Sequence, residues 1–146
     1  MEHKEVEILL IEDNHDEAEL TIRALRKQRL ANRLYHIDDG VKALEFIFGD
    51  VEGNARNQEF NPRLILLDLK LPKVDGLEIL RRLKGNETTR TIPVVVLTSS
   101  KEESDIIESY RLGVNSYIVK PVNFDSFTRA VSDLGLYWMV LNQTHD

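Results

Sequence analysis

The chain has 146 residues, of which 42% are hydrophobic and 30% are charged, and its formal net charge is −6. These values are typical of one folded domain and exclude a disordered chain. The absence of cysteine excludes disulfides and cysteine-based catalytic or metal sites, and the negative charge argues against a nucleic-acid-binding surface. No apolar run approaches the roughly 20 residues of a membrane span, and the charged start does not fit a signal peptide, so we expect a cytoplasmic protein.

Strand-like apolar runs alternate with helix-like segments from one end of the chain to the other. Strands are predicted over residues 5–11, 34–37, 64–68, 92–97 and 116–119. Helices are predicted over about 15–29, around Val41, Leu44 and Phe48 as one buried face, around Leu77, Leu80 and Leu83 up to Gly85, over 100–113 and over about 124–141. This alternation predicts a single doubly wound α/β domain over residues 1–146, with a parallel sheet covered on both faces.

Two predicted helices carry start signals. Asn14 and Glu17 have the spacing of a capping box, and so do Ser100 and Glu103. The buried stripe of the first helix is predicted to consist of Ala18, Thr21, Ile22 and Leu25. The segment 49–62 has no periodicity and is long for a connection inside a compact domain, so we expect a mobile surface loop there.

Four of the apolar runs end on polar residues. Glu12 and Asp13 follow the first run, Asp68 the third, Thr98 the fourth and Lys120 the fifth. The carboxyl ends of parallel strands share one edge of a sheet, where ligands of doubly wound folds bind. We therefore expect these side chains to meet in one shallow crevice.

This set of side chains suits a divalent cation and a phosphoryl group. Clustered carboxylates repel one another unless a hard cation such as Mg²⁺ joins them, with two direct ligands and one reached through water as a sensible division. Thr98 and Lys120 could hold phosphoryl oxygens. Aspartate can accept a phosphoryl group as an acyl phosphate, and Asp68 is the best candidate for that role.

The motifs resemble those of response-regulator receiver domains of two-component signalling. The acidic pair Glu12–Asp13 is followed by the run from Asp68 to Gly76, then by Val96–Ser99, Tyr117 and Lys120–Pro121. Thr98 lies 30 residues after Asp68, and Tyr117 lies 19 after Thr98, which agrees with the spacing of that family. The resemblance implies a flavodoxin-like five-stranded sheet in the order 2-1-3-4-5 with five helices.

The resemblance also implies roles for single residues. Asp68 would accept a phosphoryl group from the phosphohistidine of a histidine kinase. Mg²⁺ would be bound by Asp13, Asp68 and the backbone carbonyl of Lys70, with Glu12 acting through water. Lys120 and Thr98 would bind the phosphoryl oxygens, Thr98 and Tyr117 would move as a switch, and the Lys120–Pro121 bond would be cis.

Some positions allow a simpler interpretation or depart from the family. Tyr117 could be a packed edge aromatic, and Asp75–Gly76 most simply makes a turn. Glu12 stands where many relatives have aspartate. Lys70 stands two residues after the acceptor, and we hypothesise that its ammonium group alters autodephosphorylation.

The C-terminal segment carries a separate signal. Residues 136–141 are all nonpolar and would point all round a helix, whereas the sheet can cover only one stripe. We expect self-association through the fourth helix, fifth strand and fifth helix, with Tyr137, Trp138, Val140 and Leu141 in the interface. The alternative is cover by the N-terminus of the same chain.

The expected function is a stand-alone response regulator without an output domain and without enzyme activity beyond its own phosphorylation and dephosphorylation. The aromatic C-terminal helix and long loop are similar to single-domain regulators partnered with bacterial phytochrome kinases, so the partner would be a sensor histidine kinase of that kind. Alternatives are a phosphorelay intermediate, a Mg²⁺-dependent aspartyl-phosphate hydrolase or a phosphate-independent binding module. The hydrolase would require an aspartate where Lys70 stands.

Overall fold

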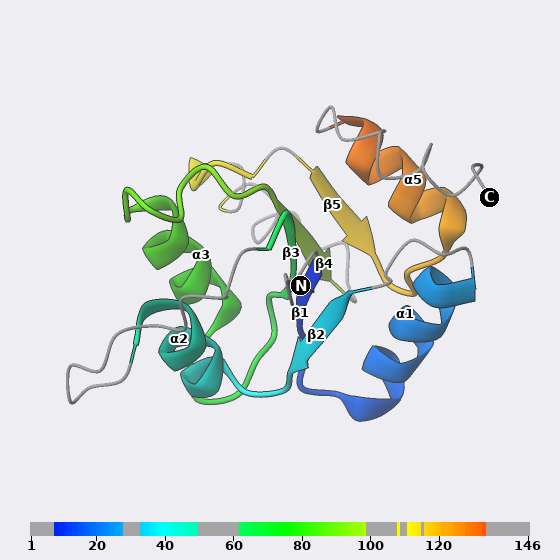
Figure 1. Ribbon diagram of the computed structural model, residues 1–146, viewed down its shortest axis with the longest axis horizontal. Coiled ribbons are helices and arrows are strands. Elements are labelled where there is room, and N and C mark those ends of the chain that lie inside the picture. Colours follow the sequence, from blue (N-terminus) through cyan, green and yellow to red (C-terminus); the bar gives the residue numbers. More distant parts are fainter. Residues whose placement is uncertain are drawn as a thin grey trace, which may run out of the picture.

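The computed structural model describes residues 8–27, 33–49, 62–98, 108, 111–114 and 116–133 (Figure 1). Its strands are β1 (Ile8–Ile11), β2 (Leu34–Ile37), β3 (Leu64–Asp68), β4 (Val94–Thr98) and β5 (Ser116–Val119). Its helices are α1 (His15–Lys27), α2 (Gly40–Phe48), α3 (Gly76–Lys84) and α5 (Phe124–Asp133). The described part of the chain thus contains four helices, and the helix predicted over 100–113 lies mostly outside it. None of the described helices has both the length and the apolar character needed to traverse a lipid bilayer.

The five strands form one parallel sheet in the order β2-β1-β3-β4-β5, which confirms the predicted sheet. Ile11 pairs with Leu67, Asp68 with Leu97, and Thr98 with Val119. The strands therefore end almost level with one another. This register is what brings the residues after β1, β3 and β5 to one edge of the sheet.

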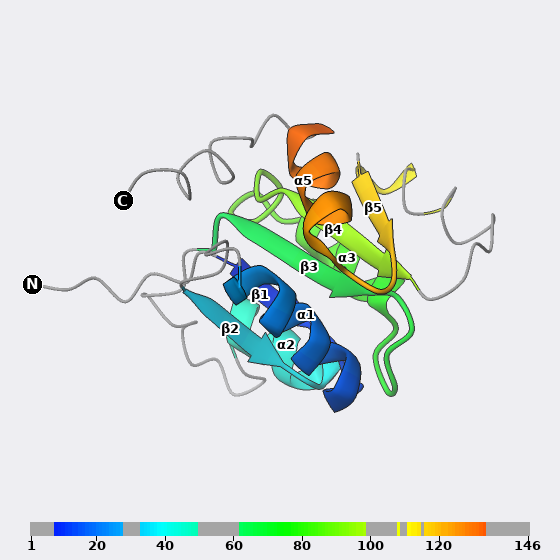
Figure 2. The same cartoon turned by 90° about the vertical axis from the view of Figure 1, so that its right-hand side faces the viewer.

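The sheet lies between two helical layers, with α1 and α5 on one face and α2 and α3 on the other (Figures 1 and 2). Successive strand residues enter opposite cores: Leu10 and Leu66 pack toward α1 and α5, whereas Leu9 and Ile65 pack toward α2 and α3. All four of these side chains are inaccessible to solvent. Burial on both faces explains why the strands are continuous apolar runs, as predicted.

The predicted face of α2 is wrong by one residue. The buried residues are Gly40, Ala43 and Ile47, whereas Val41 is 39% exposed. The predicted face (Val41, Leu44 and Phe48) has the same helical spacing as the buried one. Its larger apolar side chains explain why the sequence pattern pointed to it. A Cβ atom on Gly40 would lie 2.7 Å from the carbonyl oxygen of Val74, so the helix packs closely through its small residues.

The capping box predicted for α1 forms only in half. The backbone N–H of Glu17 donates to Asn14 Oδ1 at 2.9 Å, as expected for a cap. The backbone N–H of Asn14 donates instead to Glu12 Oε2 at 3.1 Å, and the Glu17 carboxylate accepts from Lys120. Of the predicted buried stripe, Ala18, Thr21 and Leu25 are buried, and Ile22 is partly buried against the same core.

The turn from β3 into α3 is tightly packed. Asp75 caps α3 by accepting from the backbone N–H of Leu77. A Cβ atom on Gly76 would lie 2.3 Å from the carbonyl oxygen of Asp68, which leaves room for glycine alone. Lys73 has a positive φ of 66°, and its Nζ lies 3.2 Å from Asp39 Oδ2 at the start of α2.

Several predictions fall outside the described residues. They concern the capping box of Ser100 and Glu103, most of the 49–62 loop, and the interface residues Tyr137, Trp138, Val140 and Leu141. The last predicted helix is described as α5 up to Asp133.

Candidate functional site

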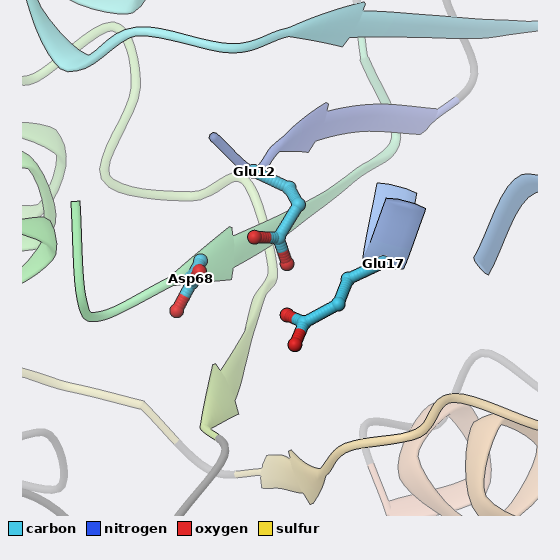
Figure 3. A group of neighbouring side chains, drawn as sticks. All are labelled: Glu12, Glu17 and Asp68. Carbon is cyan, nitrogen blue, oxygen red and sulfur yellow. The ribbon is translucent and has the colours of Figure 1, made fainter. Parts of the chain in front are cut away.

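Three carboxylates converge at the carboxyl edge of the sheet (Figure 3). Glu12 directly follows β1, Asp68 is the last residue of β3, and Glu17 lies in the first turn of α1. Each contributes an oxygen to a group whose members lie within 4.8 Å of one another. The side chains of Glu12 and Asp68 are 1% and 3% exposed, whereas that of Glu17 is 41% exposed.

Lys120 joins the three carboxylates. Its Nζ donates to Glu12 Oε1 at 3.0 Å, to Asp68 Oδ2 at 3.2 Å and to Glu17 Oε1. Its backbone N–H donates to the carbonyl oxygen of Thr98 at 2.8 Å, which ties it to the end of β4. The peptide bond to Pro121 is cis, the form that the resemblance implies. The ammonium group thus lies at the centre of the site.

Both oxygens of Asp68 are held. Oδ1 accepts from the backbone N–H of Lys70 at 3.0 Å, while Oδ2 accepts from Lys120. A carboxylate fixed in this way has one orientation at the strand end. The side chain of Lys70 is exposed, and its backbone N–H lies beside the Asp68 carboxylate.

Burial raises the pKa of Glu12 to about 7, and the hydrogen bond and negative charge of Asp68 add to this effect. The ammonium of Lys120 and the N–H of Asn14 oppose the rise but do not cancel it. Burial alone would lower the pKa of Lys120, but its hydrogen bonds to Glu17 and Glu12 and the charge of Asp68 raise it. Lys120 is therefore cationic, and the carboxylates outnumber the cations within this cluster.

The other predicted residues surround this cluster. Asp13 is half-buried next to Glu12 but is not a member of the carboxylate group formed by the described residues. Thr98 is fully buried at the end of β4. Tyr117 pairs in register with Val96 and is 38% exposed on the outer strand.

Two neighbours were not predicted from the sequence. Glu17 was assigned only to the cap of α1, yet its carboxylate reaches Lys120. His36 Nε2 lies 2.8 Å from the carbonyl oxygen of Glu12, and because that oxygen can only accept, Nε2 carries the proton. No local spacing signals either contact, since the partners lie 103 and 24 residues apart.

The donor set fits a small divalent cation. Carboxylate oxygens are hard ligands, and an excess of negative charge in a nearly buried crevice favours a bound cation. The site can therefore combine a cation, a nucleophilic carboxylate and a fixed ammonium group. These are the groups that phosphoryl transfer requires.

Comparison with known proteins agrees with this chemistry. The family profile of the response regulator receiver domain matches residues 8–132. The probable methanogenesis regulatory protein FilR2 of Methanothrix harundinacea is 42% identical, over 94% of this chain and 86% of the relative. Response regulator Rcp1 of a Synechocystis strain is 39% identical, over 90% of this chain and 88% of the relative.

Solved structures give the same result. The bacteriophytochrome response regulator AtBRR is 48% identical, with a TM-score of 0.78 over 94% of this chain and 96% of that one. The Mn²⁺-bound form of Rcp1 has a TM-score of 0.68 at 39% identity, over 90% of this chain and 93% of that one. The phosphorylated cyanobacterial phytochrome response regulator RcpA has a TM-score of 0.67 at 36% identity, over 97% of this chain and 91% of that one. By sequence, fold and site, the chain belongs to the family of response regulator receiver domains, with phytochrome response regulators among its relatives.

Proposed function

We propose that this protein is a response regulator that accepts a phosphoryl group on Asp68 from the phosphohistidine of a sensor histidine kinase. The observation that carries the proposal is the convergence of Glu12, Asp68 and Lys120 from three different strand ends. A carboxylate oxygen of Asp68 would attack phosphorus while the bond from phosphorus to the donor imidazole breaks. The electron pair of that bond stays on the imidazole nitrogen, and the product is an acyl phosphate.

The chain's own residues prepare this step. The N–H of Lys70 and the ammonium of Lys120 orient the Asp68 carboxylate before the donor arrives. Lys120 then offsets negative charge on the transferred oxygens, and Thr98 would supply a hydroxyl donor from the end of β4. Tyr117, on the neighbouring strand, would change position with Thr98 and thereby shift the population of two arrangements of the outer face.

Mg²⁺ is the proposed cofactor, and when bound it would neutralise charge on the phosphoryl oxygens. Asp13, Asp68 and the carbonyl of Lys70 would hold it directly, with Glu12 acting through water. The Mn²⁺-bound form of Rcp1 supports a divalent cation in a related chain. The phosphorylated form of RcpA supports phosphorylation in another.

The test uses Mg²⁺ and acetyl phosphate as a small phosphodonor. Intact-mass measurement should show one added phosphoryl group in the wild type and none in Asp68→Asn or without Mg²⁺. Steady turnover of the donor without a phosphorylated intermediate would instead favour a hydrolase. Failure to label the wild type at Asp68 would refute the proposal.

The likeness to AtBRR and RcpA supports a phytochrome-type histidine kinase as the donor. Transfer from such a phosphorylated kinase to this chain, measured against transfer to Asp68→Asn, tests that assignment. Output through protein contact, including a homodimer through the helix predicted over 100–113, β5 and α5, is tested by sedimentation before and after phosphorylation. A monomer at all concentrations would refute the dimer.

A further inference from the structure

Glu17 differs from the two other carboxylates at Lys120 in how it is held. Glu12 is buried and accepts from the N–H of Asn14, and Asp68 is buried and accepts from the N–H of Lys70. Glu17 has 41% of its side chain exposed and reaches Lys120 from the first turn of α1. The Glu17 side chain can therefore turn out into water. The carboxylates of Glu12 and Asp68 cannot do so without breaking their buried hydrogen bonds.

The ammonium group of Lys120 has no donor to spare in this state. An ammonium has three N–H donors, and Nζ of Lys120 has three carboxylate partners. A phosphoryl group on Asp68 needs at least one of those donors for its own oxygens. The donor that now goes to Asp68 can pass to the phosphoryl group that Asp68 carries. A second phosphoryl oxygen can reach Nζ only if Glu12 or Glu17 releases it, and Glu17 is the one of these two with access to solvent.

Charge acts in the same direction. Phosphorylation replaces the single negative charge of Asp68 by the larger negative charge of an acyl phosphate. An oxygen of Glu17 lies within 4.8 Å of an Asp68 oxygen, so the two anions would repel each other. The Glu17 side chain thus opposes the phosphorylated state both by occupying Lys120 and by its own charge.

We propose that Glu17 is a positioning residue that holds the Lys120 ammonium in the unphosphorylated state and competes with the phosphoryl oxygens for it. This inference rests on the proposed function of Asp68. The competition lowers the affinity of the site for a phosphoryl group and favours return to the unphosphorylated state. The helix itself does not depend on this contact, because the cap of α1 uses the backbone N–H of Glu17.

The test measures affinity for beryllium trifluoride, a phosphoryl mimic that binds carboxylates, by calorimetry. Each protein is kept at a Mg²⁺ concentration shown to saturate it. We expect Glu17→Gln to bind the mimic about fivefold more tightly than the wild type, the size typical of a partly exposed ion pair. A merely structural role of Glu17 would lower thermal stability and would not raise this affinity.

Glu19→Gln is the matched control. Glu19 lies on the same helix and pairs with Arg23 at 2.8 Å, so its substitution removes the same charge without touching Lys120. Its affinity for the mimic should equal that of the wild type. Equal or weaker binding by Glu17→Gln, or an equal gain in Glu19→Gln, would overturn the inference.

Failure of the proposed function would look different. If the wild type neither binds the mimic nor gains a phosphoryl group on Asp68 from acetyl phosphate, the function itself is wrong. If the wild type does both and Glu17→Gln gains nothing, only the role of Glu17 is wrong.

Discussion

Replacement of Glu12 by glutamine in the metal-free protein tests the electrostatics of the site through the pH dependence of stability. The pKa of Glu12 rises from 4.5 to about 7 in the folded protein, chiefly because of burial and then because of Asp68. The unfolded chain therefore loses this proton at lower pH than the folded chain does. The contribution of the protonated Glu12 carboxyl group to the free energy of unfolding is fully present below about pH 4.5. It is lost as the pH rises toward 7.

The magnitude follows from the size of the shift. A rise from 4.5 to about 7 corresponds to about 3 kcal/mol of lost stability once Glu12 is ionised in both states. Between about pH 5 and pH 8 the loss amounts to about 2 kcal/mol. Glutamine does not titrate, so the variant escapes this loss. It also loses one acceptor, for Asn14 or Lys120, but that cost is the same at every pH.

Urea unfolding in the presence of a chelator measures the free energy of unfolding of both proteins at the two pH values. Between pH 5 and pH 8 the free energy of unfolding of the wild type should fall by about 2 kcal/mol relative to that of Glu12→Gln. Glu19→Gln should follow the wild type, because it alters only an exposed ion pair. Parallel pH curves for Glu12→Gln and the wild type would refute the effect of burial on the Glu12 carboxyl group.

Three further substitutions test the β3–α3 turn and Lys70, which lies beside Asp68. Gly76→Ala should destabilise the fold by about 3 kcal/mol in urea unfolding, because a Cβ atom would lie 2.3 Å from the Asp68 carbonyl oxygen. Gly85→Ala should destabilise it far less, because its Cβ atom would lie 3.2 Å from the nearest atom. Lys73→Val should be about 1–2 kcal/mol less stable than Lys73→Asn, since both lose the ion pair but only valine resists the positive φ; equal unfolding midpoints would contradict this. Lys70→Asn should change the half-life of phosphorylated Asp68 measured by intact mass, and an unchanged half-life would reject a role for the Lys70 ammonium.

The sheet and the place of the site were predictable because both follow from local patterns. Continuous apolar runs such as Leu64–Leu67 are typical of strands buried on both faces, and the polar residue after each run marks the carboxyl edge. Parallel pairing then brings Asp68, Thr98 and Lys120 together whatever the details of packing. The register confirms this, since Asp68 pairs with Leu97 and Thr98 with Val119.

The buried face of a helix and the partners of a polar side chain were less predictable, because both depend on how closely helices, strands and turns pack against one another. For α2 the sequence offers two stripes with the same spacing, and close packing against Val74 and Ile79 favours the one that contains Gly40. The adjacent acids Glu12 and Asp13 likewise differ in the metal-free protein: Glu12 joins the carboxylate cluster and Asp13 does not. Asp13 lies in a bend after β1, so the acidic pair does not place both carboxylates in one cluster.

Glu17 shows how a correct local pattern can hide a long-range contact. Its spacing from Asn14 satisfies a capping box, and half of that box exists, so nothing in the local sequence suggests another role. Glu12 already accepts from the N–H that Glu17 would have bound, which leaves the Glu17 carboxylate without its expected partner in the helix. Lys120, 103 residues away, supplies a charged donor instead. An ammonium attracts a nearby carboxylate more strongly than a backbone N–H does, so the long-range ion pair prevails over the local cap.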